Sequence, residues 1–385
     1  MSDDPRPWLD RWFEARLGDD QPGRFGSGWW SGVLSVFLGA CAVGGVLAFW
    51  FPWVLSSPDL RASYSVPAMR AVLELAIVVG FVAGCISVGR RRRKVLGATG
   101  IALCLGALLA GGGRVRVSGA PSGEELYLGL DWFLLSLLGM ALVYVPLERL
   151  WPQHRQQGSF RIGWTTDVLH FALSHLLVQA LSFAVLLPSL ALSDFVVGPA
   201  WVARQPLALQ FVELVVLGDL LQYAVHRAFH RVPFLWRFHA IHHSSRAIDW
   251  LAGSRLHLVD ATLTRALVAT PILLLGFSQP AFYAWLVALT AHAVFVHANL
   301  GARLVGLERF LVTPRYHHWH HAADAAAIDT NFAVQLPWID RLFGTQHLPE
   351  RAWPERYGIE GDPVPEGFGA QLAWPLRPES GRPRA

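Results

Sequence analysis

The chain has 385 residues, of which 53% are hydrophobic and only 16% are charged, and its formal net charge at pH 7 is +4. The three cysteines, Cys41, Cys85 and Cys104, lie inside apolar runs and form no CxxC pair, which argues against a disulfide framework and a zinc ribbon. The basic residues gather at the ends of apolar runs, a pattern typical of membrane topology and not of a face that binds nucleic acid.

Eight apolar runs approach the length of about 20 residues that an α-helix needs to cross a bilayer. The first 27 residues are polar, so we expect no cleavable signal peptide. The fifth run is expected to stop at Pro188. The sequence therefore predicts an all-α fold, a polytopic membrane helical bundle with about eight transmembrane spans, over residues 30–50, 66–88, 95–110, 126–145, 166–187, 207–225, 261–275 and 280–296.

The block of basic residues at 90–94, RRRRK, fixes the expected orientation of the bundle. Loops rich in lysine and arginine stay in the cytoplasm, so we place the loop after the second span there. Counting the spans from this loop puts the N-terminus, every histidine cluster and the C-terminus in the cytoplasm. A composition biased toward Arg, Ala, Leu and Gly favours a GC-rich bacterial genome, and hence the bacterial inner membrane.

The distribution of these runs predicts four parts of the chain. The four-span unit carries no clustered chemistry, and the sequence does not indicate its role. The tail is rich in proline and arginine, so we expect it to be cytoplasmic and partly disordered. The predicted parts are a cytoplasmic N-terminal segment at 1–27, the four-span membrane unit at 28–150, the part that holds the histidines at 151–350, and the tail at 351–385.

Eight of the 16 histidines fall into three tight groups, an HxxxH motif followed by two HxxHH motifs. On a helix, spacings of three and four place side chains on one face, so each HxxHH motif should converge on one side of a metal site. A lone buried histidine is usually a hydrogen-bonded core residue, but three such groups at one predicted membrane face exceed what packing explains. We therefore predict that these clusters bind metal: His226, His230, His239, His242, His243, His317, His320 and His321.

The number of imidazoles indicates two metal ions, because one zinc ion needs only three or four ligands. An all-nitrogen ligand set suits iron, zinc, copper or nickel, and the spacing does not choose among them. Asp219 and Tyr223 extend the helix face of the first histidine pair, where an acid can orient a ligand imidazole.

Three segments resemble a known family: HRAFHRVPFLWRFHAIHHS, PRYHHWHH and IDTNFAVQLPWIDRLFGT. They are similar to the histidine-box motifs of the fatty acid hydroxylase/sterol desaturase superfamily, whose members are integral membrane di-iron enzymes. The resemblance covers roughly residues 160–348. It implies that residues 151–350 form the catalytic domain, with a cytoplasmic helical cap that carries a histidine-rich dimetal site, and that the eight grouped histidines are ligands.

The resemblance also implies roles for residues outside the three motifs. His257 in SRLHLVD and His297 in VHANL look like further ligands, although Leu258 stands where the family usually has proline. Their neighbours Arg255 and Asn299 are retained and would support them. Three residues after the last motif would help to fold the cap: Asp329, Asn331 and Asp340.

The activity implied by the resemblance is that of a membrane-bound di-iron oxygenase. Such an enzyme would use two Fe ions, replaceable by zinc in recombinant material, and O₂ as cosubstrate to hydroxylate an unactivated C–H bond of a fatty acyl chain, a sterol or another lipid. We expect no catalytic residue beyond the metal ligands. The chain has no GxGxxG motif, so the two electrons should come from a separate protein of the ferredoxin or cytochrome/reductase type.

Three alternatives remain open at this point. A lipid desaturase, an oxidative demethylase or a lyase could use the same site. A metal transporter would place its histidines and acids near the middle of the spans, whereas here they lie at helix ends. A membrane zinc hydrolase would need a nearby general base, and the chain has no HExxH motif. The sequence indicates neither the lipid nor the oligomeric state.

Four other histidines have simpler interpretations. His318 lies out of register with its motif and should point away from the metals. His292 is expected to be a packing or pocket residue. His170 and His175 lie in the fifth run near Asp167, so hydrogen bonding between helices is the favoured reading.

Overall fold

The computed structural model describes residues 8–17, 26–117, 127–158, 160–193, 198–302, 304, 306–361 and 363–377. Within these ranges the chain forms α-helices, short 3-10 turns and loops, without a β-strand. The chain divides into two compact units. We call them the N-terminal unit, residues 8–142 and 175–179, and the C-terminal unit, mainly residues 143–174 and 180–385.

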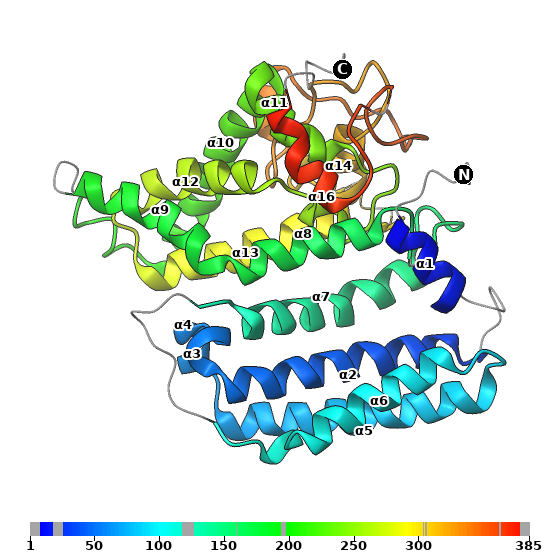
Figure 1. The fold of residues 1–385 in the computed structure, drawn as a ribbon. Helices are drawn as coiled ribbons and strands as arrows, with labels where there is room; N and C mark the ends of the chain where they lie inside the picture. The colour runs from blue at the N-terminus through cyan, green and yellow to red at the C-terminus, as the bar shows by residue number, and fades with distance from the viewer. Residues whose placement is uncertain are drawn as a thin grey trace. The chain divides into compact units, whose positions relative to one another are not determined.

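The N-terminal unit is a bundle of apolar helices that pack closely through small residues. A Cβ added at Gly97 would lie 2.8 Å from the carbonyl oxygen of Gly84, and one at Gly100 would lie 2.0 Å from Oγ of Ser35. Small residues of this kind let the backbones of membrane helices approach one another. The helices are α1 (Trp8–Leu17), α2 (Trp29–Trp50), α3 (Pro52–Leu55), α4 (Pro58–Ser63), α5 (Val66–Arg90), α6 (Val95–Leu109), η1 (Gly112–Arg114) and the first part of α7 (Leu130–Leu150), drawn from blue to green in Figure 1.

The C-terminal unit packs its long helices around a second apolar core. Trp285 is 1% exposed, and its ring lies so close to Gly218 that a Cβ there would be 2.5 Å from the indole. Leu214, Val268 and Ile272 complete this core, which fixes the ends of the helices where the histidines lie. The elements are α8 (Trp164–Leu176), α9 (Val178–Ser193), α10 (Leu207–Arg231), α11 (Pro233–His243), η2 (Ala252–Ser254), α12 (Leu258–Leu274), α13 (Gln279–His297), η3 (Leu307–Arg309), α14 (Pro314–His320), α15 (Trp338–Phe343), α16 (Phe368–Ala373) and η4 (Trp374–Leu376) (Figure 1).

The all-helical, polytopic architecture predicted from the sequence is confirmed. Among the described residues, six helical segments are long and apolar enough to cross a membrane: α2, α5, α6 with η1, α7, α10 and α13. The expected span at 166–187 is instead divided at Leu177 into α8 and α9, and the one at 261–275 corresponds to α12. At 1.5 Å per residue these three helices are about 20, 24 and 26 Å long, short of a hydrocarbon core of about 30 Å. Pro188 does not stop its run, because it lies inside α9.

The last described part of the chain folds against α11. We call residues 354–361 and 363–376 the C-terminal strap. Its Ile359, Val364 and Trp374 pack with Trp236 and Ile241 of α11, and all five side chains are at most 9% exposed. From the sequence, this stretch was expected to belong to the tail. The final residues of that tail, 378–385, lie outside the described residues, as do 1–7 and 18–25 of the predicted N-terminal segment.

Candidate metal centre

Nine of the ten histidines expected to be metal ligands come together in two groups. In each group, the nitrogen atoms that the imidazoles offer all lie within 4.8 Å of one another, as a shared metal ion requires. Both groups consist of histidines alone. Group one is His226, His230, His239, His243 and His320, and group two is His242, His297, His317 and His321.

Each HxxHH motif contributes to both groups, whereas the sequence analysis expected each motif to face one side of a site. In α11, His239 and His243 join group one and His242 joins group two. A helix turns by about 100° per residue, so two adjacent histidines cannot point at the same ion. In α14 and its C-cap the assignment is reversed. His317 and His321, which are four residues apart, join group two, and His320 joins group one.

The spacing between ring nitrogens matches the edges of a metal coordination sphere. The Nε2 atoms of His226 and His239 are 3.1 Å apart in group one. In group two, Nε2 of His297 is 3.3 Å from that of His242 and 3.0 Å from that of His317. With metal–nitrogen bonds of about 2.1 Å, two ligands are about 3.0 Å apart at a right angle and about 3.4 Å apart at a tetrahedral angle. The groups therefore have the dimensions of metal sites.

Five buried ring nitrogens in the two groups have no hydrogen-bond partner: Nε2 of His230, His243 and His320, and Nδ1 of His242 and His317. Buried polar atoms are nearly always paired, and a metal ion in group one would pair the three Nε2 atoms. Nδ1 of His242 and of His317 lies on the far side of its ring, because Nε2 of each faces the other rings of group two. Burial lowers the pKa of His243 and His321 well below the ordinary value for histidine. The imidazoles of His243 and His321 are therefore neutral at pH 7, the form that binds a metal ion.

Backbone carbonyl groups orient several of the rings. His226 donates from Nδ1 to the carbonyl of Phe332 at 2.9 Å, and His320 donates to that of Thr330 at 2.7 Å. Both carbonyls belong to the loop after α14, where Asp329 and Asn331 have φ angles of 58° and 56°. Asp and Asn tolerate this left-handed conformation better than most residues. The local sequence therefore directs the carbonyl groups of residues 330 and 332 toward the imidazoles.

Two carboxylates also hold rings of group one. Nδ1 of His239 lies 2.7 Å from Oδ2 of Asp260, and Nδ1 of His230 lies 3.3 Å from Oδ1 of Asp329. A carboxylate on the far nitrogen fixes the orientation of a metal-binding imidazole and raises its basicity. Asp260 was not among the residues expected from the sequence. The available signal was its place in the first turn of α12, three residues after His257.

His257 lies outside both groups. It is the N-cap of α12, and its Nδ1 accepts a hydrogen bond of 3.1 Å from the backbone N–H of Val259. Its Nε2 is 3.2 Å from the carbonyl oxygen of Leu372 in the strap. Both ring nitrogens are therefore engaged away from the metal groups.

The five residues expected to support the ligands contact the frame of the site. Asp219 accepts hydrogen bonds from the N–H groups of residues 334–336, and the Tyr223 hydroxyl is 3.0 Å from that of Thr345. Asn331 donates to the carbonyls of residues 316 and 347, and Asn299 accepts from the N–H of residue 154. Arg255 pairs with Asp167. These bonds position the loops and not the imidazole rings directly.

The four histidines with simpler interpretations lie outside both groups. Nδ1 of His318 is 2.8 Å from the hydroxyl of Tyr357, and its Nε2 is 3.3 Å from the carbonyl oxygen of His297, so its ring points away from both groups. His170 hydrogen-bonds with the carbonyl of Leu256 and with the side chain of Gln371. His175 stacks on Trp132 in the N-terminal unit. Nε2 of His292 is buried and has no hydrogen-bond partner.

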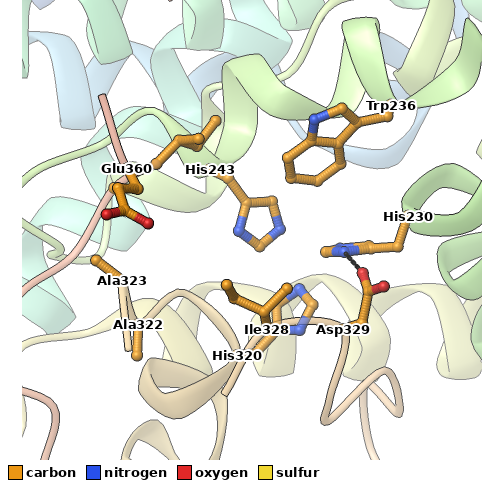
Figure 2. Close-up of a pocket in the computed structure, with 11 residues that line it drawn as sticks. His230, Trp236, His243, His320, Ala322, Ala323, Ile328, Asp329 and Glu360 are labelled. Carbon is orange, nitrogen blue, oxygen red and sulfur yellow. Dashed lines mark ion pairs between the residues drawn. The ribbon is translucent and has the colours of Figure 1, made fainter. Parts of the chain in front are cut away.

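A pocket opens onto group one. Three of its ligands, His230, His243 and His320, line this pocket together with Trp236 (Figure 2). Figure 2 shows Asp329 beside His230 and Glu360 across the pocket from it. The strap supplies one wall, through residues 358–360, and is joined to the end of α14 by a bridge between Ala322 and Tyr357. Group one therefore faces an opening whose wall belongs to the C-terminal strap.

Long apolar helices and two compact imidazole groups define the class, a helical protein with segments able to cross a membrane and two sites that could hold metal ions. A family model described as fatty acid hydroxylase matches residues 211–345, which include every histidine of both groups. The ornithine lipid hydroxylase OlsE of Rhizobium tropici is 34% identical over 257 residues, covering 64% of this chain and 76% of that protein. The chain therefore belongs to the fatty acid hydroxylase family, as the sequence motifs predicted.

Other relatives match over shorter stretches. The human alkylglycerol monooxygenase is 30% identical over 128 residues, covering 33% of this chain and 28% of that protein. A rice very-long-chain aldehyde decarbonylase, GL1-1, is 27% identical over 179 residues, covering 44% of this chain and 28% of that protein. No solved structure matches. Members named hydroxylase and monooxygenase are oxidoreductases that act on lipids, which places this protein in a family of lipid-oxidising enzymes.

Proposed function

We propose that this protein is a membrane-bound di-iron oxygenase that hydroxylates an unactivated C–H bond of a lipid. The balanced reaction converts R–H, O₂, two electrons and two protons into R–OH and water. One observation carries the proposal: nine imidazoles, eight of them buried, offer their nitrogens in two compact groups, and the Nε2 atoms of His230, His243 and His320 have no hydrogen-bond partner. The hydroxylases and monooxygenases among the relatives support the reaction type.

The residues present fit two iron ions, one in each group. The nine histidines of groups one and two would be the ligands, and His257 would cap α12 instead. Imidazole suits iron, and no thiolate or carboxylate belongs to either group. Bound iron would supply the O₂ activation that protein side chains lack.

The protein's own part in the reaction is positioning and the exclusion of water. Asp260 and Asp329 keep two imidazoles of group one in fixed orientations. The indole of Trp236 and the apolar side chains of Ile328 and Ile359 line the pocket beside these rings. We infer that the reacting part of the lipid enters here, because apolar walls hold a C–H bond near the metal while they keep solvent away.

The substrate and the cellular setting follow from the relatives and from the charge pattern. The match to OlsE spans three quarters of that protein, so an ornithine-containing lipid is the first substrate to test. The electrons for the proposed reaction would come from a separate ferredoxin or cytochrome/reductase system. The basic block at 90–94 favours a bacterial inner-membrane protein with the histidine groups on the cytoplasmic side.

The test combines metal content with product analysis. Protein from iron-supplemented cells is reconstituted with ornithine lipid, a ferredoxin, its reductase and ¹⁸O₂, and the lipid is analysed by mass spectrometry. We expect about two irons per chain and a lipid that has gained one ¹⁸O atom; the His320→Ala/His321→Ala variant loses both. The control is His175→Ala, in the other unit. A lipid that only loses two hydrogens would make the enzyme a desaturase, and metal content unchanged in the double variant would exclude the proposal.

A further inference from the structure

The C-terminal unit exposes a compact patch of large apolar and basic side chains. We call it the apolar-basic patch and define it as Leu307, Arg309, Phe310, Arg341, Leu342 and Phe343. Phe310 is 72% exposed, Leu342 is 66% exposed and Phe343 is 48% exposed. The two parts of the patch adjoin each other, because Arg341 donates a hydrogen bond of 2.9 Å to the backbone carbonyl of Arg309. Clusters of this kind on a soluble surface usually mark an interaction site.

The patch is held rigidly from inside. Asp340 in α15 is fully buried, and its carboxylate accepts hydrogen bonds from the N–H groups of Phe332 and Ala333 at 2.9 Å each. It also accepts from the hydroxyl groups of Thr345 and Tyr316. Arg341, Leu342 and Phe343 follow directly and are exposed because α15 is fixed in this orientation. Their exposure is thus a property of the fold.

The charge of the patch is positive. Glu308 is the one acidic residue within the segment 307–310, and it is 6% exposed and paired with Arg315. Arg309 and Arg341 are exposed. The outer surface therefore combines four large apolar side chains with two arginines whose charge no acid of the patch offsets.

The patch lies beside the last turns of a helix that is long and apolar enough to cross a membrane. Phe343 stacks on Tyr223 of α10, with the ring centroids 4.9 Å apart. Arg227, one turn further along α10, donates a hydrogen bond of 3.1 Å to the Tyr223 hydroxyl. Tyr223 is buried, and an arginine near the end of an apolar helix is typical of the level where the helix leaves the hydrocarbon core. The patch is continuous with that level.

We propose that the apolar-basic patch lies in the headgroup region of the bilayer. Phe310, Leu342 and Phe343 enter the boundary with the acyl chains, and Arg309 and Arg341 bind lipid phosphates. Apolar side chains flanked by cations are how interfacial segments bind anionic membranes. The contact fixes the depth of residues 330–345 in the membrane. Within this segment the carbonyls of residues 332 and 330 orient His226 and His320. This inference goes beyond the proposed function, and it holds whatever metal or reaction the site supports.

The test measures depth in the membrane with the full chain. In a background with Cys41→Ala, Cys85→Ala and Cys104→Ala, a single cysteine replaces Phe310, Leu342 or the control residue Phe234 and carries a bimane fluorophore. Phe234 is 62% exposed and lies three residues after Arg231, the last residue of α10, which is about 12 Å beyond Tyr223 along the helix axis. Each protein is placed in nanodiscs of phosphatidylethanolamine and phosphatidylglycerol that contain lipids with a nitroxide near the glycerol backbone.

We expect the nitroxide lipids to quench bimane at 310 and 342 several-fold more than at 234, and aqueous iodide to show the reverse order. Equal quenching at the three positions, or iodide access at 310 and 342 like that at 234, would overturn the proposal; a docking surface for a soluble protein would behave in this way. If the cysteine-free chain does not fold, a fluorescent amino acid introduced at the same positions of the natural chain gives the same comparison.

A pair of charge-reversed variants tests the role assigned to the arginines. Arg309→Glu with Arg341→Glu should lower the lipid quenching at 310 several-fold. The matched control reverses two exposed arginines of the C-terminal unit outside the patch, Arg351→Glu with Arg356→Glu, and should leave it unchanged. Equal effects of the two pairs would show that the arginines of the patch do not bind lipid phosphates.

Discussion

Asp260 holds His239 in place through a short contact, with Oδ2 of the carboxylate 2.7 Å from Nδ1 of the imidazole. Both residues are at most 5% exposed. The opposite nitrogen of the same ring, Nε2, lies 3.1 Å from Nε2 of His226. One carboxylate outside the metal groups therefore determines which nitrogen of a predicted ligand faces the metal position.

Removal of this carboxylate should weaken metal binding without unfolding the chain. We expect Asp260→Ala to lower the metal affinity of group one by about 10–100-fold, because the ring loses its orientation and its basicity. Competition with a chelator of known affinity measures the change. Thr264→Val is the control, since the Thr264 hydroxyl contacts the other carboxylate oxygen, Oδ1, at 3.2 Å. An affinity unchanged in Asp260→Ala would contradict the role given to this residue.

Two double variants test whether adjacent histidines serve different groups. One removes two imidazoles from the same group, and the other removes one imidazole from each group. His243→Ala with His320→Ala removes two ligands from group one, so about one metal ion should remain in group two. His320→Ala with His321→Ala removes one ligand from each group and should lose both ions. Metal analysis of the purified variants measures the outcome. Identical metal contents in the two double variants would show that the groups do not act as separate sites.

A buried ion-pair network should contribute far more to stability than a surface pair. Arg161 contacts Asp167 at 2.5 Å and Asp249 at 2.7 Å, and all three side chains are at most 4% exposed. Asp249→Ala should lower the free energy of unfolding by about 3–5 kcal/mol, because it leaves a buried guanidinium partly uncompensated.

The matched control is the Arg246–Glu366 pair, in which both side chains are 31% exposed. Glu366→Ala should cost less than about 1 kcal/mol, since solvent screens the pair. Thermal unfolding in detergent, followed by circular dichroism, compares the two variants. Equal shifts in melting temperature would contradict the importance of the buried network.

The C-terminal strap should stabilise the unit that carries the histidines. Trp374 is 6% exposed, and Trp374→Ala should lower the free energy of unfolding by about 3–5 kcal/mol through the cavity that it leaves against α11. Leu376→Ala is the control, because Leu376 is 74% exposed and its loss should change stability by less than about 0.5 kcal/mol. The same melting experiment measures both. A Trp374→Ala variant as stable as the control would mean that the strap is not part of the cooperative fold.

The helices and the histidine motifs could be predicted because their signals are local. Apolar runs of sufficient length set α2, α5 and α10, and spacings of three and four bring histidines to one side of a helix. The division of His242 and His243 between two groups could not be predicted in this way. It depends on where α10, α13 and α14 lie around α11, and a spacing within one helix does not contain that information.

Two further features were missed for related reasons. Asp260 is 21 residues from His239 in the chain, so only the packing of α12 brings the two together. The strap was assigned to a tail because the end of the chain as a whole is rich in proline and arginine. Its few apolar side chains, Ile359, Val364 and Trp374, are enough to fold it, since α11 offers them a matching apolar surface.

The place of the strap at the end of the chain has a consequence for biosynthesis. Ribosomes add about 5–20 residues per second, so about 3–10 s separate the synthesis of His321 from that of Trp374. Every histidine of both groups is therefore made before the wall of the pocket that residues 358–360 provide. The side of group one that opens to the pocket is completed last, and a chain that terminates early leaves the ribosome with all of these histidines and an unfinished wall.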